Sequence, residues 1–174
     1  MSNFHPFRHR GLTYDFYHLE NHMFDVETDG GTYRVRADYS HHVFTESLAD
    51  ETAPDLRYRH NNETRAFCFV RYELSKSVPA LLESQERRQV YNSNRQSFFI
   101  AKDTDGVPYY VFFRCFQARK KSNAHVRIEV ASAYLKPNMI SQAPAVKFTT
   151  LIEKTARGEE IKLPKPSQVR FRNG

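Results

Sequence analysis

The stretch Tyr33-Arg34-Val35-Arg36-Ala37-Asp38-Tyr39-Ser40 decides the fold, because apolar and polar side chains alternate along its whole length. The odd-numbered residues are apolar and the even-numbered ones are charged or polar, a period of two that is typical of a half-buried β-strand. Residues 24–27 alternate in the same way, and Asp29-Gly30-Gly31 between the two runs is a strong turn signal. We therefore predict a β-hairpin over residues 24–40.

A second group of strands is predicted between residues 97 and 135. The runs 98–100 and 109–113 are apolar on both faces, which is typical of strands covered on both sides. The turn 103–106 separates them, and after the basic turn 119–123 an alternating run from His125 to Ala133 returns. These segments predict a three-stranded meander that includes the centre of the sheet. Residues 14–19 are predicted to form an earlier strand on the same sheet as the hairpin.

Helix signals are found in two places. Ser75 or Ser77 can cap a helix over residues 75–90, Pro79 suits its first turn, and a narrow apolar face places it on the surface. Residues 148–155 have helical apolar spacing and Gly158 suits a C-cap, with a strand over 146–152 as the competing interpretation. The polar segment 46–65 is predicted to be a long surface loop, and 67–70 a short buried strand.

Length and composition predict one α+β domain. The chain has 174 residues, of which 40% are hydrophobic and 14% aromatic, enough for one core. A mainly antiparallel, twisted sheet with one or two surface helices is predicted for residues 1–161, and a basic, flexible tail for residues 162–174. No stretch approaches the roughly 20 apolar residues that span a bilayer, and the polar N-terminus lacks the apolar segment of a signal peptide. We expect a cytoplasmic location and no contact with a membrane.

Positive charge is the main functional signal. The chain has 26 Lys and Arg against 20 Asp and Glu, a formal net charge of +6, and eight His. This surplus favours RNA or another polyanion as partner, or an acidic protein surface. The side chains expected to contact phosphates are Arg34, Arg36, Arg87, Arg88, Arg95, Arg119, Lys120 and Lys121. An ordinary solvated charged surface is the alternative.

Several familiar motifs are missing from the chain. It contains no P-loop, GxGxxG, GxSxG or HExxH sequence, and no RNP1 or GxxG signature of the common RNA-binding modules. These absences weigh against nucleotide-driven machines, Rossmann enzymes and serine hydrolases. The carboxylates are scattered and do not form the acidic cluster that two-metal nucleases need.

Histidines supply the one catalytic hypothesis. Cleavage of RNA needs a base for the 2′-hydroxyl and an acid for the leaving oxygen, and imidazole transfers protons near neutral pH. His41 and His42 follow the clearest strand, and His125 and Tyr134 lie at the two ends of another. Because neighbouring strand residues point to opposite faces, at most one of His41 and His42 is expected to face a given site. The hypothesis is a metal-independent endoribonuclease without a cofactor, and hydrogen-bonded structural histidines are the alternative.

A metal site is the weaker interpretation of the N-terminal histidines. His5 and His9, and likewise His18 and His22, are four residues apart, which on a helix would place each pair on one face. The surrounding sequence has no helix signature and no cysteine ligands. We therefore predict no metal site.

Several strings carry a resemblance to a known family. They are Tyr14-Asp-Phe-Tyr-His18-Leu19, Tyr39-Ser-His-His-Val-Phe-Thr45, Arg71-Tyr-Glu-Leu-Ser75, Tyr110-Val-Phe-Phe113 and Ser132-Ala-Tyr134. Over residues 12–155 the chain resembles a bacterial family sometimes labelled growth-adaptation or heat-shock-like, which implies a bacterial or mobile-element origin and a role in stress or growth control. The resemblance transfers no catalytic residues. The sheet pattern over 97–135 is also similar, at the level of the fold, to ribonuclease toxins of the barnase and RelE type.

Two functions therefore compete. The first is an RNA-interacting, toxin-like protein with or without ribonuclease activity. The second is a non-catalytic protein that binds an acidic protein partner in stress, phage-related or growth control. The sequence leaves the oligomeric state open.

Overall fold

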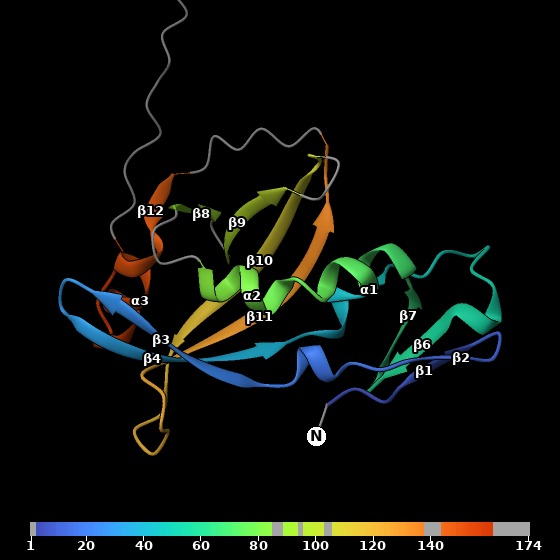
Figure 1. Ribbon diagram of the computed structural model, residues 1–174, viewed down its shortest axis with the longest axis horizontal. Helices are drawn as coiled ribbons and strands as arrows, with labels where there is room; N and C mark the ends of the chain where they lie inside the picture. Colours follow the sequence, from blue (N-terminus) through green and yellow to red (C-terminus); the bar gives the residue numbers. More distant parts are fainter. Residues whose placement is uncertain (1–2, 85–88, 94–95, 103–105, 138–143, 162–174) are drawn as a thin grey trace, which may run out of the picture.

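A twisted seven-stranded sheet dominates the computed structural model, which describes residues 3–84, 89–93, 96–102, 106–137 and 144–161 (Figure 1). Neighbouring strands are antiparallel except for one parallel pair, β11 with β4. The order across the sheet is β12 (Ala145–Lys147), β8 (Gln89–Ser93), β9 (Gln96–Lys102), β10 (Pro108–Gln117), β11 (Val126–Leu135), β4 (Gly31–Tyr39) and β3 (His22–Thr28). The predicted mainly antiparallel α+β fold is confirmed.

The hairpin and the meander form as their alternation predicts. In β4, Val35 and Ala37 are fully buried, whereas Arg34 is exposed and Arg36 is half-buried on the opposite face. Gly31, with φ of 121°, adopts a backbone conformation at the hairpin turn that side chains rarely allow. Strands β9, β10 and β11 pair in sequence order, and β10 has neighbours on both sides.

The parallel pairing of β4 and β11 joins the hairpin to the meander. Val126 pairs with Val35 and Val130 with Tyr39. Because a parallel pair needs a long crossover, residues 40–125 of the chain lie between the two strands in sequence. This seam brings two distant stretches of polar side chains together on one face of the sheet.

A second lobe, at the right of Figure 1, consists of two small sheets and short helices, formed by the N-terminal segment before β3 and by the first part of the crossover. Its elements are β1 (Phe7–His9), β2 (Leu12–Tyr14), η1 (Tyr17–Leu19), η2 (His41–Val43), β5 (Thr45–Glu46), η3 (Pro54–Leu56), β6 (Arg57–His60) and β7 (Glu63–Phe67). Aromatic rings fill its centre, where Phe16 stacks on Phe44 with ring centroids 4.0 Å apart. These rings belong to the same core as buried residues of the large sheet such as Val35, Val111 and Ile128. A separate, smaller cluster of the large sheet consists of Phe98, Tyr110 and Phe112.

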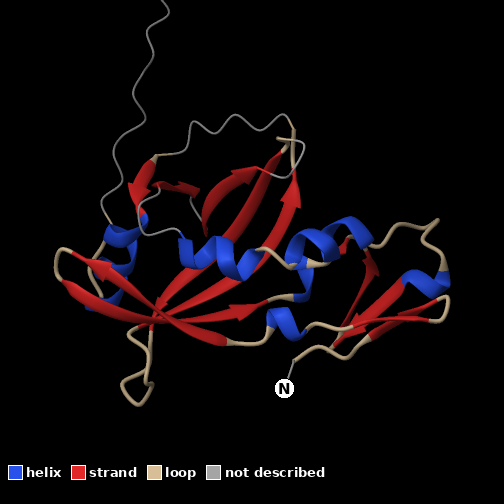
Figure 2. Ribbon diagram, viewed as in Figure 1, coloured by secondary structure: helices blue, strands red, loops and turns tan. Residues whose placement is uncertain are grey.

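Three α-helices complete the described part of the chain (Figure 2). They are α1 (Phe69–Ser75), α2 (Val78–Glu83) and α3 (Phe148–Arg157). Helix α3 buries Phe148, Leu151 and Ile152, and it ends at Gly158, which has a φ of 69°. The predicted helix with its glycine C-cap is confirmed over the competing strand.

Four local predictions were wrong, each for an identifiable reason. Segment 46–65 contains the hairpin β6–β7, whose turn is made by Asn61 at a left-handed φ of 52° rather than by glycine. Residues 67–70 end a strand and begin α1. The helix predicted over 75–90 is shorter: α2 covers Val78–Glu83 with Pro79 in its first turn as predicted, whereas Gln89 and Val90 begin strand β8. Residues 14–19 contribute the end of β2 and η1, outside the large sheet.

None of the helices in the described ranges is both long and apolar enough to cross a bilayer. The predicted basic tail, residues 162–174, lies outside the described residues.

His18 links the stability of the fold to pH. Its Nε2 donates to Ser75 Oγ at 2.8 Å, because the Ser75 hydroxyl itself donates to the Tyr72 carbonyl. Burial lowers the pKa of His18 below its ordinary value of 6.5. A histidine with a lowered folded-state pKa contributes stability that is complete above the unfolded pKa and is lost as pH falls through the folded pKa. The free energy of unfolding should therefore decrease as the pH falls from 7 to 5.

Urea unfolding at a series of pH values measures this contribution. The slope between pH 7 and pH 5 should be shallower in His18→Gln than in the wild type. His5→Gln, which changes an exposed histidine, should keep the wild-type slope. Equal slopes in the wild type and His18→Gln would contradict the assignment.

Candidate nucleic-acid interface

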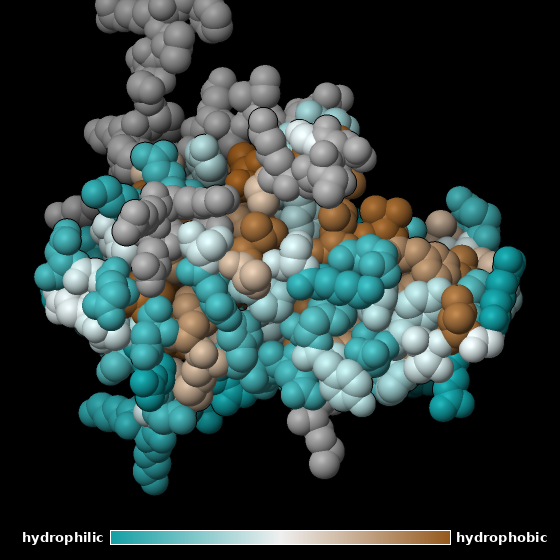
Figure 3. Space-filling view, in the orientation of Figure 1, coloured by the Kyte–Doolittle hydropathy of each residue, from teal (hydrophilic) through white to brown (hydrophobic). Residues whose placement is uncertain are grey.

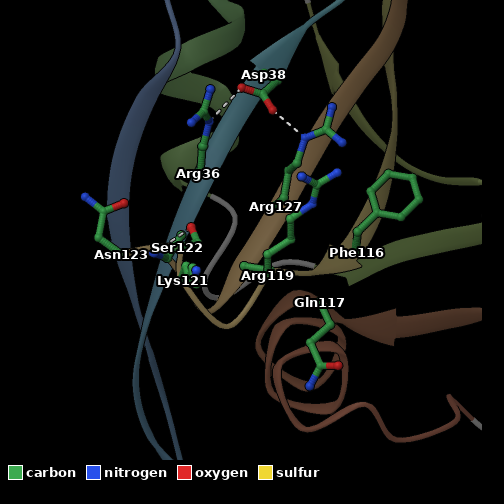
Figure 4. A pocket seen from close by; sticks show the side chains of 11 residues that line it. Arg36, Asp38, Phe116, Gln117, Arg119, Lys121, Ser122, Asn123 and Arg127 are labelled. Carbon is green, nitrogen blue, oxygen red and sulfur yellow. Dashed lines mark hydrogen bonds and ion pairs between the residues drawn. The ribbon is translucent and has the colours of Figure 1, made fainter.

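A basic groove of about 840 Å³ lies on the open face of β4, β10 and β11, beside the β10–β11 loop (Figure 4). Four cations and one carboxylate line it, an excess of three positive charges. Its lining residues are Arg36, Asp38, Phe116, Gln117, Ala118, Arg119, Lys121, Ser122, Asn123, Ala124 and Arg127. In Figure 3 the protruding loop, at the lower left, is covered by hydrophilic side chains. Three of the side chains predicted to contact phosphates line this groove, Arg36, Arg119 and Lys121.

Strand register aligns the floor of the groove. Phe116 on β10 pairs with Arg127 on β11, Arg127 with Arg36 on β4, and Arg36 with Met23 on β3. The Arg127 guanidinium lies 5.7 Å from the centroid of the Phe116 ring. The result is a row of two guanidiniums flanked by two apolar side chains, Phe116 at 40% exposure and Met23 at 39%.

Asp38 fixes the two arginines of the floor. Arg36 Nε donates to Oδ1 at 2.9 Å, and Arg127 Nε donates to Oδ2 of the same carboxylate (Figure 4). Each arginine uses its Nε in this contact, and the terminal nitrogens of Arg36 form no hydrogen bond with the part of the chain that the structure describes, which leaves them for another acceptor. A guanidinium held in this way is pre-organised for bidentate contact with a phosphate.

The loop above the floor is held by its own backbone. Ser122 N donates to the Arg119 carbonyl at 2.8 Å, and Ala118 N donates to the His125 carbonyl at 3.0 Å. Arg119 and Lys121 are exposed, and neither forms an ion pair with any residue in the described ranges. Their charges are therefore available at the rim of the groove.

His125 anchors the end of this loop. The backbone N–H of His125 donates to the Arg34 carbonyl at 2.7 Å, and its ring Nδ1 accepts a hydrogen bond from the backbone N–H of Arg34 at 2.8 Å. This two-way contact with one backbone position occupies one ring nitrogen. The geometry gives His125 a structural part in positioning the loop.

The other residues predicted to contact phosphates do not line the groove or lie outside the described residues. Arg34 forms a two-point ion pair with Asp25, at 2.9 and 3.2 Å, next to the groove rather than in it. Lys120 is exposed in the same loop but does not line the groove. Arg87, Arg88 and Arg95 lie outside the described residues.

His41 and His42 lie together in η2, just beyond the end of β4. Their ring centroids are 4.6 Å apart, and both Nε2 atoms approach Glu63 Oε2, at 3.2 and 2.9 Å. The prediction that at most one of them faces a given site was wrong, because the strand ends at Tyr39 and Ser40 caps a 3-10 helix by accepting the His42 N–H. Burial, and next the adjacent His42, lower the pKa of His41 to about 4.

The structure does not bring His125 to this pair. His125 is level with Arg34 at one end of the seam, and His41 follows Tyr39 at the other. Five strand residues separate these levels, roughly 17 Å at about 3.3 Å per residue. Tyr134 makes a different contact: its ring is 5.1 Å from the Arg71 guanidinium, and Arg71 donates to the Thr45 carbonyl.

The four N-terminal histidines have four separate surroundings. His5 stacks on Tyr58, and His9 lies 3.4 Å from Asp55. His18 contacts Ser75, and His22 lies 3.0 Å from Glu83. They do not converge on one point.

Two important groove residues were absent from the sequence prediction, Arg127 and Phe116. The alternation of buried and exposed residues in their strands could have placed both side chains on the exposed face, since each points away from buried neighbours such as Ile128. What the sequence does not show is the parallel register that places Arg127 beside Arg36.

The model of the YjaZ family matches residues 6–156. The chain belongs to the YjaZ family. It is 33% identical over 147 residues to Protein YjaZ of Escherichia coli strain K12, an alignment that covers 78% of this chain and 76% of the relative. No solved structure matches the chain. The expected membership of a bacterial family is confirmed, whereas the growth-adaptation label and the likeness to barnase and RelE toxins stay predictions.

Proposed function

We propose that this YjaZ-family protein binds single-stranded RNA in the basic groove. The observation that carries the proposal is the row that aligns an exposed phenylalanine with two guanidiniums across neighbouring strands. A sheet face that combines an aromatic ring with basic side chains suits unpaired bases, which stack on the ring while the phosphates meet the cations. Base pairs in a duplex do not expose their faces in this way.

The aromatic ring is also what favours RNA over an acidic protein partner. Acidic side chains of a protein partner would form ion pairs with the four cations, but a carboxylate does not stack on an aromatic ring. Arg127 lies over the Phe116 ring, so a stacked base would meet both an aromatic surface and a positive charge. The proposal does not include cleavage of the RNA, because His125 is too far from His41 and His42 to exchange protons at one phosphate.

Salt dependence and one substitution test the binding. Fluorescence anisotropy with a labelled, unstructured RNA oligonucleotide should give a plot of log affinity against log salt with a slope of about −2 to −3. This follows from about 0.7 counterions released per phosphate contact and up to four cations. Phe116→Ala should weaken binding about tenfold, since stacking of one base contributes roughly 1–3 kcal/mol.

The matched control is Phe69→Ala, which removes another partly exposed phenylalanine, at 36% against 40%, from the start of helix α1. It should bind as the wild type does. A flat salt response, or equal losses in the two variants, would exclude the groove as an RNA site. Tighter binding to an acidic polypeptide than to RNA at equal salt would favour the acidic-partner alternative.

A further inference from the structure

His41, His42 and Glu63 form a group whose donor atoms point at one another. One ligand atom from each residue lies within 4.8 Å of the others, and in the described part of the chain this is the one such group of three or more His, Cys, Asp or Glu side chains. Glu63 Oε2 is the shared centre, 2.9 Å from His42 Nε2 and 3.2 Å from His41 Nε2. The group belongs neither to the groove nor to the N-terminal histidines.

His41 carries a second, independent signal. Its side chain is only 10% exposed, and its Nε2 is buried without a hydrogen-bond partner although the Glu63 carboxylate lies 3.2 Å away. A buried polar atom without a hydrogen bond costs free energy and calls for a physical reason. A metal cation bound to the lone pair of His41 Nε2 would be such a reason.

We propose that His41, His42 and Glu63 bind a divalent transition metal, with Zn²⁺ as the ion that the donor set fits best. Two imidazole nitrogens and one carboxylate oxygen suit Zn²⁺ rather than Mg²⁺ or Ca²⁺, which prefer oxygen ligands. In a tetrahedral site, bonds of about 2.1 Å place the donor atoms roughly 3.4 Å apart, close to the contacts observed. Three protein ligands leave a fourth position of a tetrahedral site for water or another ligand.

Arg65 supports these ligands from behind. Its NH1 donates to Glu63 Oε1 at 3.1 Å, which leaves Oε2 for the histidines. Its Nε donates to Thr45 Oγ1 at 2.9 Å, and Thr45 Oγ1 donates to the His41 carbonyl at 2.8 Å. A closed set of contacts therefore fixes the two ends of the site relative to each other, as hydrogen bonds around metal ligands commonly do.

Competition with a chromophoric chelator measures Zn²⁺ binding to the full chain purified without a histidine tag. We expect one Zn²⁺ per chain in the wild type. Glu63→Gln should bind at least about tenfold more weakly, since loss of even a supporting contact around a metal typically costs 10–100-fold. Glu63→His, which restores a nitrogen ligand, should bind more tightly than Glu63→Gln.

Glu83→Gln is the matched control. Glu83 also lies 3.0 Å from a buried histidine nitrogen without a hydrogen bond, Nε2 of His22, but this pair is not part of a group of three donors. The control should bind Zn²⁺ as the wild type does, and Zn²⁺ should raise the melting temperature of both by more than it raises that of Glu63→Gln. If Glu63→Gln does not fold, His42→Ala carries the same expectation. No Zn²⁺ binding by the wild type, or equal losses in Glu63→Gln and Glu83→Gln, would overturn the proposal.

Discussion

Replacement of Arg119 and Lys121 together by glutamate is expected to weaken single-stranded RNA binding roughly 100-fold, about 2.7 kcal/mol. Both side chains are exposed at the rim of the groove and form no ion pair with a described residue, so the change removes two attractions and adds two repulsions. The loop itself should persist, because it is held by backbone contacts and by His125. Anisotropy titrations at fixed salt measure the loss, and the dependence on salt should become shallower.

Arg57→Glu with Arg59→Glu supplies the control for net charge. These arginines are exposed on β6 in the second lobe, two residues apart as Arg119 and Lys121 are. Reversal of their charges changes the protein's net charge by the same amount. If both double variants lose affinity equally, binding depends on overall charge, and the groove has no special part in it.

Phe16→Ala should lower the free energy of unfolding by about 3–5 kcal/mol. The Phe16 ring is 1% exposed, stacks on Phe44 at 4.0 Å and meets Tyr58 and Tyr72 edge-on. Its removal leaves a cavity that surrounding rings cannot close without leaving their own contacts. Urea denaturation measures the loss as a lower midpoint with little change in the slope.

Tyr17→Ala is the neighbouring control, because Tyr17 is 71% exposed. We expect a change within about 0.5 kcal/mol, as for an ordinary surface position. A loss of less than about 1 kcal/mol in Phe16→Ala would mean that the second lobe is not cooperatively joined to the large sheet.

Local pattern predicted the strands of the large sheet better than those of the second lobe. Val35 and Ala37 alternate with Arg34 and Arg36 over a full strand, so side-chain period alone identifies β4. Strands β6 and β7 are short, and polar residues such as Arg57 and Arg59 alternate there with few apolar ones. Their pairing depends on aromatic packing between distant segments, which a local period does not record.

The candidate site shows the same division. Arg36, Arg119 and Lys121 were predicted from charge alone, and the structure places them around one groove. Arg127 and Phe116 become part of the site only through the pairing of β4 with β11. His41 and His42 were predicted as functional residues, but their convergence on Glu63 depends on a 3-10 turn that strand periodicity does not predict.

The seam between β4 and β11 has a consequence for protein synthesis. Arg127 and its partner Asp38 are 89 residues apart in the chain. At a translation rate of about 5–20 residues per second, β4 emerges from the ribosome roughly 4–18 s before the strand that will cover its free edge. During that interval the nascent hairpin exposes unpaired backbone groups of the kind that attract other strands. This protein therefore acquires its groove only late in synthesis, after the paired hairpin has already emerged.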